Sequence, residues 1–242
     1  MGDITVDFCN GFRTYLLDAK QLKHTKRKLS NNSAAGYWST FRGFLAVAYK
    51  DHKLTENVND YLEAIKYEDT EREYLTLEEL QQLAETPCNE PVLRAASLFS
   101  CLTGLRFGDV RDLTWEKIEK YPDGGYCIRI VTEKTKTSAV LPISDEALEF
   151  CGKRGKGKVF KGLTYAMVQK ELEGWLEYVG IDKHVTFHCF RHTYATLLLD
   201  GGIDIYTVSK MLTHRNVSTT QIYTAVMDKN KRKAADSLKI KK

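Results

Sequence analysis

Near the C-terminal end of the chain, three polar side chains fall at spacings that chemistry could use: His188, Arg191 and Tyr223. His188 and Arg191 are three residues apart, so on a helix both would point to the same side. The pair would place a titratable imidazole beside a permanently charged guanidinium, an arrangement that suits a phosphate group. Tyr223 taken alone would more often be a core aromatic residue than a nucleophile.

The segment that carries Tyr223 has the signals of a helix start. Ser218 and Gln221 have the spacing of a capping box, and Val217 and Ile222 lie where a hydrophobic staple would form. We therefore expect Tyr223 in the second turn of a helix that Ser218 caps.

A second arginine lies at a predicted bend between helices. Thr76 and Glu79 form another capping box at the start of one helix, and Pro91 begins the next. That second helix runs to a break at Gly104, and Arg106 follows directly. Arg106 is thus expected at a sharp turn, where a side chain can be aimed into a site.

Two runs with a period of two residues, 127–132 and 139–143, predict strands joined by a polar turn. The turn carries Lys134 and Lys136. The remainder of the chain has helical periodicity, so the expected fold class is mainly α with a small antiparallel β-sheet (α+β).

The chain is expected to form two domains. Residues 1–66 read as an all-helical domain with basic edges, 67–73 as a charged linker, and 74–242 as a second domain with a C-terminal tail. The lysines of the first domain could equally be a solvated surface.

Composition sets wide limits. With 242 residues and 43% hydrophobic content, the sequence is typical of a globular protein. We expect it in the cytoplasm, without a membrane-spanning segment or secretory signal, and with six reduced cysteines because no C-x-x-C spacing occurs. The formal charge of +4 depends on the tail: residues 228–242 hold seven Lys or Arg against two Asp, a balance of +5, which leaves −1 for the remainder. DNA affinity would therefore come from local patches.

Two other kinds of site are disfavoured. Gly152, Gly157 and Lys158 match part of a phosphate-binding loop, but Val159 stands where a Ser or Thr is required and a helix precedes the loop. A zinc site on the histidines is also disfavoured, because no Glu follows His188 and the nearby arginine would oppose a cation.

The combined pattern resembles the tyrosine recombinase (phage integrase) family. Its elements come in order: Arg106, a lysine in a strand turn, His188 with Arg191, His214, and Tyr223 nine residues after it. The resemblance covers nearly the whole chain, with 1–66 similar to a helical core-DNA-binding domain and 74–242 similar to a catalytic domain. Members often carry a further N-terminal arm-binding domain, for which we expect no counterpart here.

The resemblance implies a role for each residue. Arg106 and Arg191 would clamp the phosphate, His188 would receive or orient the tyrosine proton, His214 would donate to a phosphate oxygen, and Tyr223 would be the nucleophile.

The catalytic lysine is expected on the strand turn. The family usually places it eight residues before the proline of the following strand, which selects Lys134 ahead of Pro142, with Lys136 as the rival. This lysine would protonate the departing 5′ oxygen.

By the same resemblance the protein would be a site-specific recombinase or integrase that cleaves and rejoins double-stranded DNA through a 3′-phosphotyrosine. It would need neither ATP nor a metal cofactor, and would act as a homotetramer on paired sites, with DNA-bending accessory proteins as possible partners. Two alternatives stay open: a helical DNA-binding regulator that does not cut, and a type IB topoisomerase-like enzyme.

Overall fold

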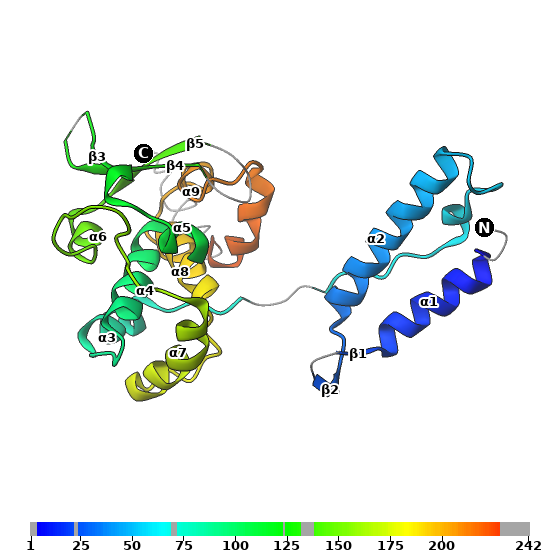
Figure 1. Cartoon of the computed structure of the whole chain (residues 1–242), viewed down its shortest axis with the longest axis horizontal. Helices are drawn as coiled ribbons and strands as arrows, with labels where there is room; N and C mark the ends of the chain where they lie inside the picture. The colour runs from blue at the N-terminus through cyan, green and yellow to red at the C-terminus, as the bar shows by residue number, and fades with distance from the viewer. Residues whose placement is uncertain (1–3, 22–23, 69–71, 123, 132–137, 228–242) are drawn as a thin grey trace, which may run out of the picture. The chain divides into compact units, whose positions relative to one another are not determined.

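The computed structural model describes residues 4–21, 24–68, 72–122, 124–131 and 138–227. The chain forms two compact units, Met1–Glu71 (unit 1) and Arg72–Lys242 (unit 2) (Figure 1). Among the described residues, no helix is long and apolar enough to cross a membrane.

Unit 1 is built on two helices that start at side-chain caps. Its elements are α1 (Val6–Asp18), β1 (Lys20–Gln21), β2 (His24–Lys28), α2 (Asn31–Lys50) and the 3₁₀ helix η1 (Val58–Tyr61). Thr5 caps α1 and Ser30 caps α2, each by accepting a backbone N–H. Trp38 lies at the centre of the core of this unit, and its indole N–H donates to the Glu63 carbonyl at 2.8 Å.

The prediction that residues 1–66 are all helical is wrong at one place, the antiparallel hairpin of β1 and β2. Its sequence is a run of charged and polar residues, so no apolar alternation marks the strands. The hairpin is closed by the Leu29 N–H, which donates to the Ala19 carbonyl, and by an ion pair of 2.8 Å between Lys28 and Asp18.

Unit 2 combines a set of helices with a small sheet, which lies at one edge of the unit (Figure 1). Its elements are α3 (Leu77–Glu85), α4 (Pro91–Thr103), α5 (Phe107–Arg111), η2 (Trp115–Lys117), β3 (Ile118–Lys120), β4 (Tyr126–Val131), β5 (Ser138–Ile143), α6 (Asp145–Glu149), α7 (Tyr165–Val179), α8 (Phe187–Asp200), α9 (Ile205–Met211) and η3 (Val217–Met227). The capping box of Thr76 and Glu79 is present at the start of α3, as predicted.

The predicted fold class is confirmed, and the sheet of unit 2 has one strand more than expected. The sheet has the order β3-β4-β5, and both pairs are antiparallel. β3 is three residues long and follows η2 directly, which explains why its period could not be seen in the sequence.

Helix α8 is the central element of unit 2. It packs against α4 on one side and against η3 and α9 on another. One end of it joins the large core through Phe187 and Phe190, whereas Ala195 and Leu199 belong to a separate small cluster with α9 and η3. A helix buried on several sides can hold polar side chains in fixed positions between its neighbours.

Candidate phosphate-handling site

Arg191 of α8 ties two distant segments together. Its side chain is only 2% exposed, and its Nη1 donates to the Gly104 carbonyl at 2.7 Å while its Nη2 donates to the Leu212 carbonyl. Gly104 ends α4 and comes two residues before Arg106; Leu212 ends α9 and comes two residues before His214. Arg191 thereby sets the starting points of two loops that each carry a predicted site residue.

Gly104 has a backbone conformation that this arrangement requires. Its φ is +67°, in the left-handed region where a Cβ is unfavourable. A Cβ at this position would lie 2.5 Å from Cδ1 of Tyr194 and 2.9 Å from Cδ2 of Leu212. The predicted helix break is confirmed, and the close approach of α8 and α9 adds a second reason for glycine.

Arg106 lies close to Arg191, at the N-cap position of α5. Burial lowers the pKa of Arg191 to about 10, and the charge of Arg106 is the next largest cause. Nη1 of Arg106 is buried and has no hydrogen-bond partner among the described residues. The Asp109 carboxylate offsets part of this positive charge, but the buried donor of Arg106 is unsatisfied, so a further anion would stabilise the pair.

Tyr223 lies in η3 and is 5% exposed. Its ring packs with Ala195, Leu199, Val208 and Leu212. Burial raises the pKa of its hydroxyl, while the charges of Arg191, Arg72 and Arg106 act in the opposite direction. The tyrosine hydroxyl and the arginine pair therefore share one electrostatic environment.

The local prediction around Tyr223 needs a correction. Residues Val217–Met227 form a 3₁₀ helix, so Ser218 lies inside the helix and is not its cap. The Ser218 N–H donates to Oδ1 of Asn216 at 3.0 Å, which makes Asn216 the residue that caps the first turn. The sequence contained this signal, because Asn is as good a cap as Ser.

The histidines occupy different positions around the tyrosine. Nδ1 of His192 lies 2.7 Å from the Tyr223 hydroxyl, and the His188 ring meets the His192 ring edge to face with centroids 4.6 Å apart. Nδ1 of His214 lies 2.8 Å from the hydroxyl of the buried Thr220. Lys134 and Lys136 lie outside the described residues.

Two residues near the site were not singled out from the sequence. His192 has the Tyr223 hydroxyl as its hydrogen-bond partner in the structure. Arg72, at the start of unit 2, contributes to the lowered pKa of His192 and opposes the raised pKa of Tyr223. Arg72 lies in the predicted linker 67–73, where no local pattern marks a site residue.

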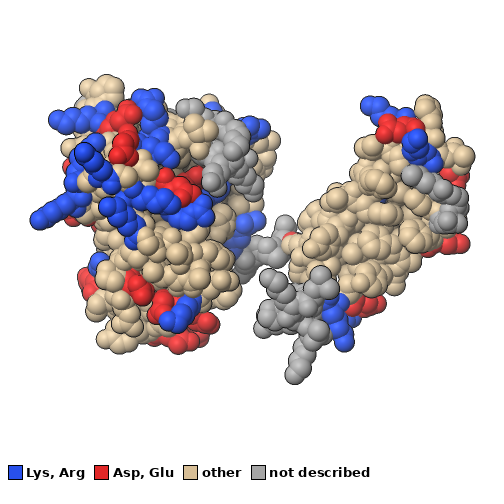
Figure 2. All heavy atoms as spheres, viewed as in Figure 1, with Lys and Arg blue, Asp and Glu red and all other residues tan. Residues whose placement is uncertain are grey.

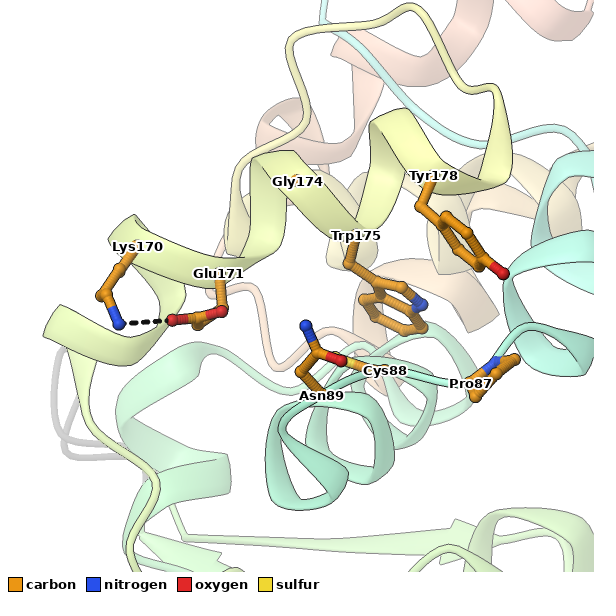
Figure 3. A pocket seen from close by; sticks show the side chains of 8 residues that line it. All are labelled: Pro87, Cys88, Asn89, Lys170, Glu171, Gly174, Trp175 and Tyr178. Carbon is orange, nitrogen blue, oxygen red and sulfur yellow. Dashed lines mark ion pairs between the residues drawn. The ribbon is translucent and has the colours of Figure 1, made fainter.

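A hollow of about 520 Å³ lies elsewhere in unit 2, between α7 and the turn that joins α3 to α4 (Figure 3). Trp175 and Tyr178 line it, and its single lining cation, Lys170, pairs with Glu171 at 2.8 Å. It has no arginine among its lining residues, so it does not share the chemistry of the arginine pair. No group of three metal-ligating side chains occurs in the described part of the chain.

A basic loop follows α6. Lys153 and Lys156 are exposed on it, whereas Arg154 donates to the Ile118 carbonyl at 3.0 Å and Lys158 pairs with Asp112 at 2.9 Å. Figure 2 shows Lys and Arg gathered over the part of unit 2 that holds the sheet. The loop is thus fixed to the sheet while two of its lysines stay exposed. α6 precedes it and no helix begins until Tyr165, so the rejection of a nucleotide-binding loop agrees with the structure.

Unit 2 therefore has a buried tyrosine and two arginines on a mainly helical fold with one small sheet, and comparison with known proteins shows its family. Residues 73–230 match the model of the phage integrase family, and residues 1–67 match the model of the phage integrase SAM-like domain. The chain belongs to the phage integrase family, the tyrosine recombinases, which catalyse site-specific recombination. The resemblance seen in the sequence is confirmed.

Individual relatives agree with this assignment. Tyrosine recombinase XerC of Haemophilus influenzae is 28% identical over 218 residues, which cover 82% of this chain and 72% of the relative. Tyrosine recombinase XerD of Halalkalibacterium halodurans is 32% identical over 173 residues, or 63% of this chain and 56% of the relative.

Two solved structures show the same fold. XerH recombinase bound to palindromic difH substrate, in a post-cleavage complex, has a TM-score of 0.72 at 19% identity, with 97% of this chain and 72% of that chain covered. A lambda integrase fragment, solved as a dimer bound to a COC′ core site, has a TM-score of 0.69 at 20% identity, with 91% and 80% covered.

Proposed function

We propose that Tyr223 is the nucleophile of a DNA strand-exchange reaction that proceeds through a 3′-phosphotyrosine. The observation that carries the proposal is the burial of the Tyr223 hydroxyl in the same electrostatic environment as Arg106 and Arg191. The tyrosine oxygen attacks phosphorus, the bond to the 5′ oxygen breaks, and the phenolic proton is released. The phosphodiester energy is kept in the new ester, so rejoining is the reverse reaction.

The two arginines suit the charge that develops during attack. Each guanidinium can make paired hydrogen bonds to non-bridging phosphate oxygens. The unsatisfied Nη1 of Arg106 supplies one such donor. Arg191 donates two of its five guanidinium N–H groups to backbone carbonyls, so three remain for other acceptors.

The proposed roles of the other residues are those implied by the family resemblance. His188 would take up or orient the phenolic proton, and His214 would donate to a phosphate oxygen. Lys134, or its rival Lys136, would protonate the departing 5′ oxygen. The reaction as proposed uses no metal and no ATP.

Covalent trapping tests the proposal. Wild-type protein incubated with nicked duplexes from genomic fragments should give a protein–DNA adduct that survives denaturant, and peptide mapping should place it on Tyr223. Tyr223→Phe should give no adduct while it keeps DNA affinity, because it removes one oxygen and retains the ring. Tyr206→Phe is the matched control, since Tyr206 is 58% exposed on α9.

The trapping result also separates the alternatives. A regulator that does not cut would give no adduct with wild-type protein. A type IB topoisomerase-like enzyme would give the adduct but would not exchange strands between two sites. A recombinase should do both, and we propose that it acts as a homotetramer on paired sites, with DNA-bending proteins as accessory factors.

Both units are proposed to bind duplex DNA, unit 1 as the core-binding domain and unit 2 as the catalytic domain. The basic loop after α6 supports a phosphate contact from unit 2, because Lys153 and Lys156 are exposed on a fixed backbone. Binding should therefore weaken steeply with salt. Removal of residues 1–66 should reduce both the affinity and its salt dependence, and unchanged values would contradict a role for unit 1.

A further inference from the structure

His192 touches the atom that is proposed to react. Its Nδ1 lies 2.7 Å from the Tyr223 hydroxyl oxygen, the ring centroids are 5.4 Å apart, and both side chains are at most 5% exposed. A phenol is a good donor and an unprotonated imidazole nitrogen is a good acceptor, so the hydroxyl is taken to donate to Nδ1. A buried hydroxyl with one well-placed acceptor has its rotation restricted.

The backbone of His192 is held on both sides. The preceding residue, Arg191, bonds the carbonyls at the ends of α4 and α9. The following residue, Thr193, accepts the Leu75 N–H at 2.9 Å and donates to the Cys189 carbonyl at 3.0 Å. His192 is therefore a fixed acceptor between two anchored neighbours, whereas its partner lies in a 3₁₀ helix near the end of the described chain.

The surroundings of His192 do not favour a proton on its ring. Burial and the nearby charges of His188, Arg72 and Arg191 lower its pKa to about 3. A protonated His192 would add a positive charge to a buried group that already contains Arg191. Because its pKa is lowered in this way, His192 is better suited to hold the hydroxyl than to take up its proton.

We propose that His192 is a positioning residue, whose Nδ1 accepts the hydrogen bond of the Tyr223 hydroxyl and holds that oxygen beside the arginine pair before attack. The proposal rests on the proposed role of Tyr223 as nucleophile. The phenolic proton leaves to a different group during attack, and His192 stays neutral. Its function is that of a fixed support that reduces the number of orientations available to the nucleophile.

Two substitutions separate positioning from packing and from proton uptake. His192→Asn keeps an acceptor, because the amide oxygen stands as many bonds from Cα as Nδ1 does, but an amide takes up no proton at neutral pH. His192→Phe keeps a planar ring and has no acceptor. The measurement is the single-turnover rate of adduct formation at saturating DNA, on a nicked duplex whose sequence was recovered by trapping wild-type protein.

We expect His192→Phe to slow adduct formation by about 100-fold with unchanged DNA affinity, the loss typical of a misplaced reacting group, and His192→Asn to stay within about tenfold of wild type. A phenylalanine variant as fast as wild type would overturn the proposal. An asparagine variant as slow as phenylalanine would overturn it as well, since that result indicates proton uptake by the ring. Absence of an adduct with wild-type protein would instead count against the proposed function.

A measurement on folded protein without DNA keeps the proposal testable if either variant fails to fold. In ¹⁵N-histidine NMR spectra of wild-type protein between pH 5 and pH 8, His192 should be the neutral Nε2–H tautomer. Its Nδ1 resonance should shift in Tyr223→Phe, which removes the donor, and should not shift in Tyr206→Phe. An Nδ1–H tautomer, or no response to Tyr223→Phe, would refute the hydrogen bond on which the inference depends.

Discussion

Replacing Gly104 with alanine adds one methyl group at the point where α4, α8 and α9 approach one another. Two costs can be worked out from the structure. The φ of +67° places an alanine in the left-handed region, at about 1–2 kcal/mol. The new Cβ would also lie 2.5 Å from the Tyr194 ring and 2.9 Å from Leu212, and overpacking of this kind costs about 1–3 kcal/mol. The expected loss of unfolding free energy is therefore about 2–5 kcal/mol.

Gly180 offers a matched control for the backbone cost alone. It also ends a helix, α7, with a φ of +87°, but a Cβ there would meet nothing within 4 Å. Gly180→Ala should therefore cost about 1–2 kcal/mol. The difference between the two variants isolates the steric cost.

The assay is denaturant unfolding of the full chain, and thermal unfolding by calorimetry is the second measurement. Both glycines lie in unit 2, so the transition of unit 1 should stay in place as an internal reference. If Gly104→Ala proved no more destabilising than Gly180→Ala, the close approach of the three helices would be wrong. Gly104→Ala should also slow adduct formation more than Gly180→Ala does, because the Gly104 carbonyl accepts from Arg191.

Arg191→Lys should lower the free energy of unfolding by about 1–3 kcal/mol and abolish most adduct formation, because one ammonium group cannot replace the hydrogen bonds to both carbonyls. A variant with the stability of wild type would contradict this. The pKa of His192 is about 3 in the folded protein and 6.5 in the unfolded chain, so the unfolded chain takes up a proton first as pH falls. The free energy of unfolding should therefore decrease from pH 7 to pH 5, and the decrease should be up to about 2 kcal/mol larger in wild type than in His192→Asn. Lys153→Ala with Lys156→Ala should reduce the slope of log affinity against log salt by about 2, with Lys170→Ala, which removes a paired lysine of α7, as the unchanged control. Adduct formation should be unchanged in excess EDTA, and loss of the adduct under these conditions would support a metal-dependent reaction.

The parts of the fold that depend on local chemistry could be predicted from the sequence. The capping box at Thr76 and Glu79, the helix start at Pro91 and the break at Gly104 all involve contacts within a few residues. The hairpin of β1 and β2 could not, because its residues are charged or polar and so leave no apolar period in the sequence.

The residues of the candidate site could be selected from their order along the chain. The contacts between them could not be predicted from the sequence. His192 and Tyr223 are 31 positions apart, and their hydrogen bond exists only because η3 packs on α8. The helical spacing from Arg191 selects His188, although it is His192 of the same helix that contacts the Tyr223 hydroxyl. Arg72 was missed for a related reason, since its effect on Tyr223 arises from tertiary proximity.

The structural role of Arg191, beside its proposed role in catalysis, also bears on how relatives should be compared. Its side chain joins the ends of two helices in this chain, so there is a structural reason to keep the arginine even without the proposed chemistry. The presence of arginine at this position is therefore weak as a marker of an active recombinase. The proposed reaction depends on the Tyr223 hydroxyl, whose contact in the core is a hydrogen bond to His192. If Tyr223 is the nucleophile, this tyrosine is the better marker for telling an inactive relative from an active one.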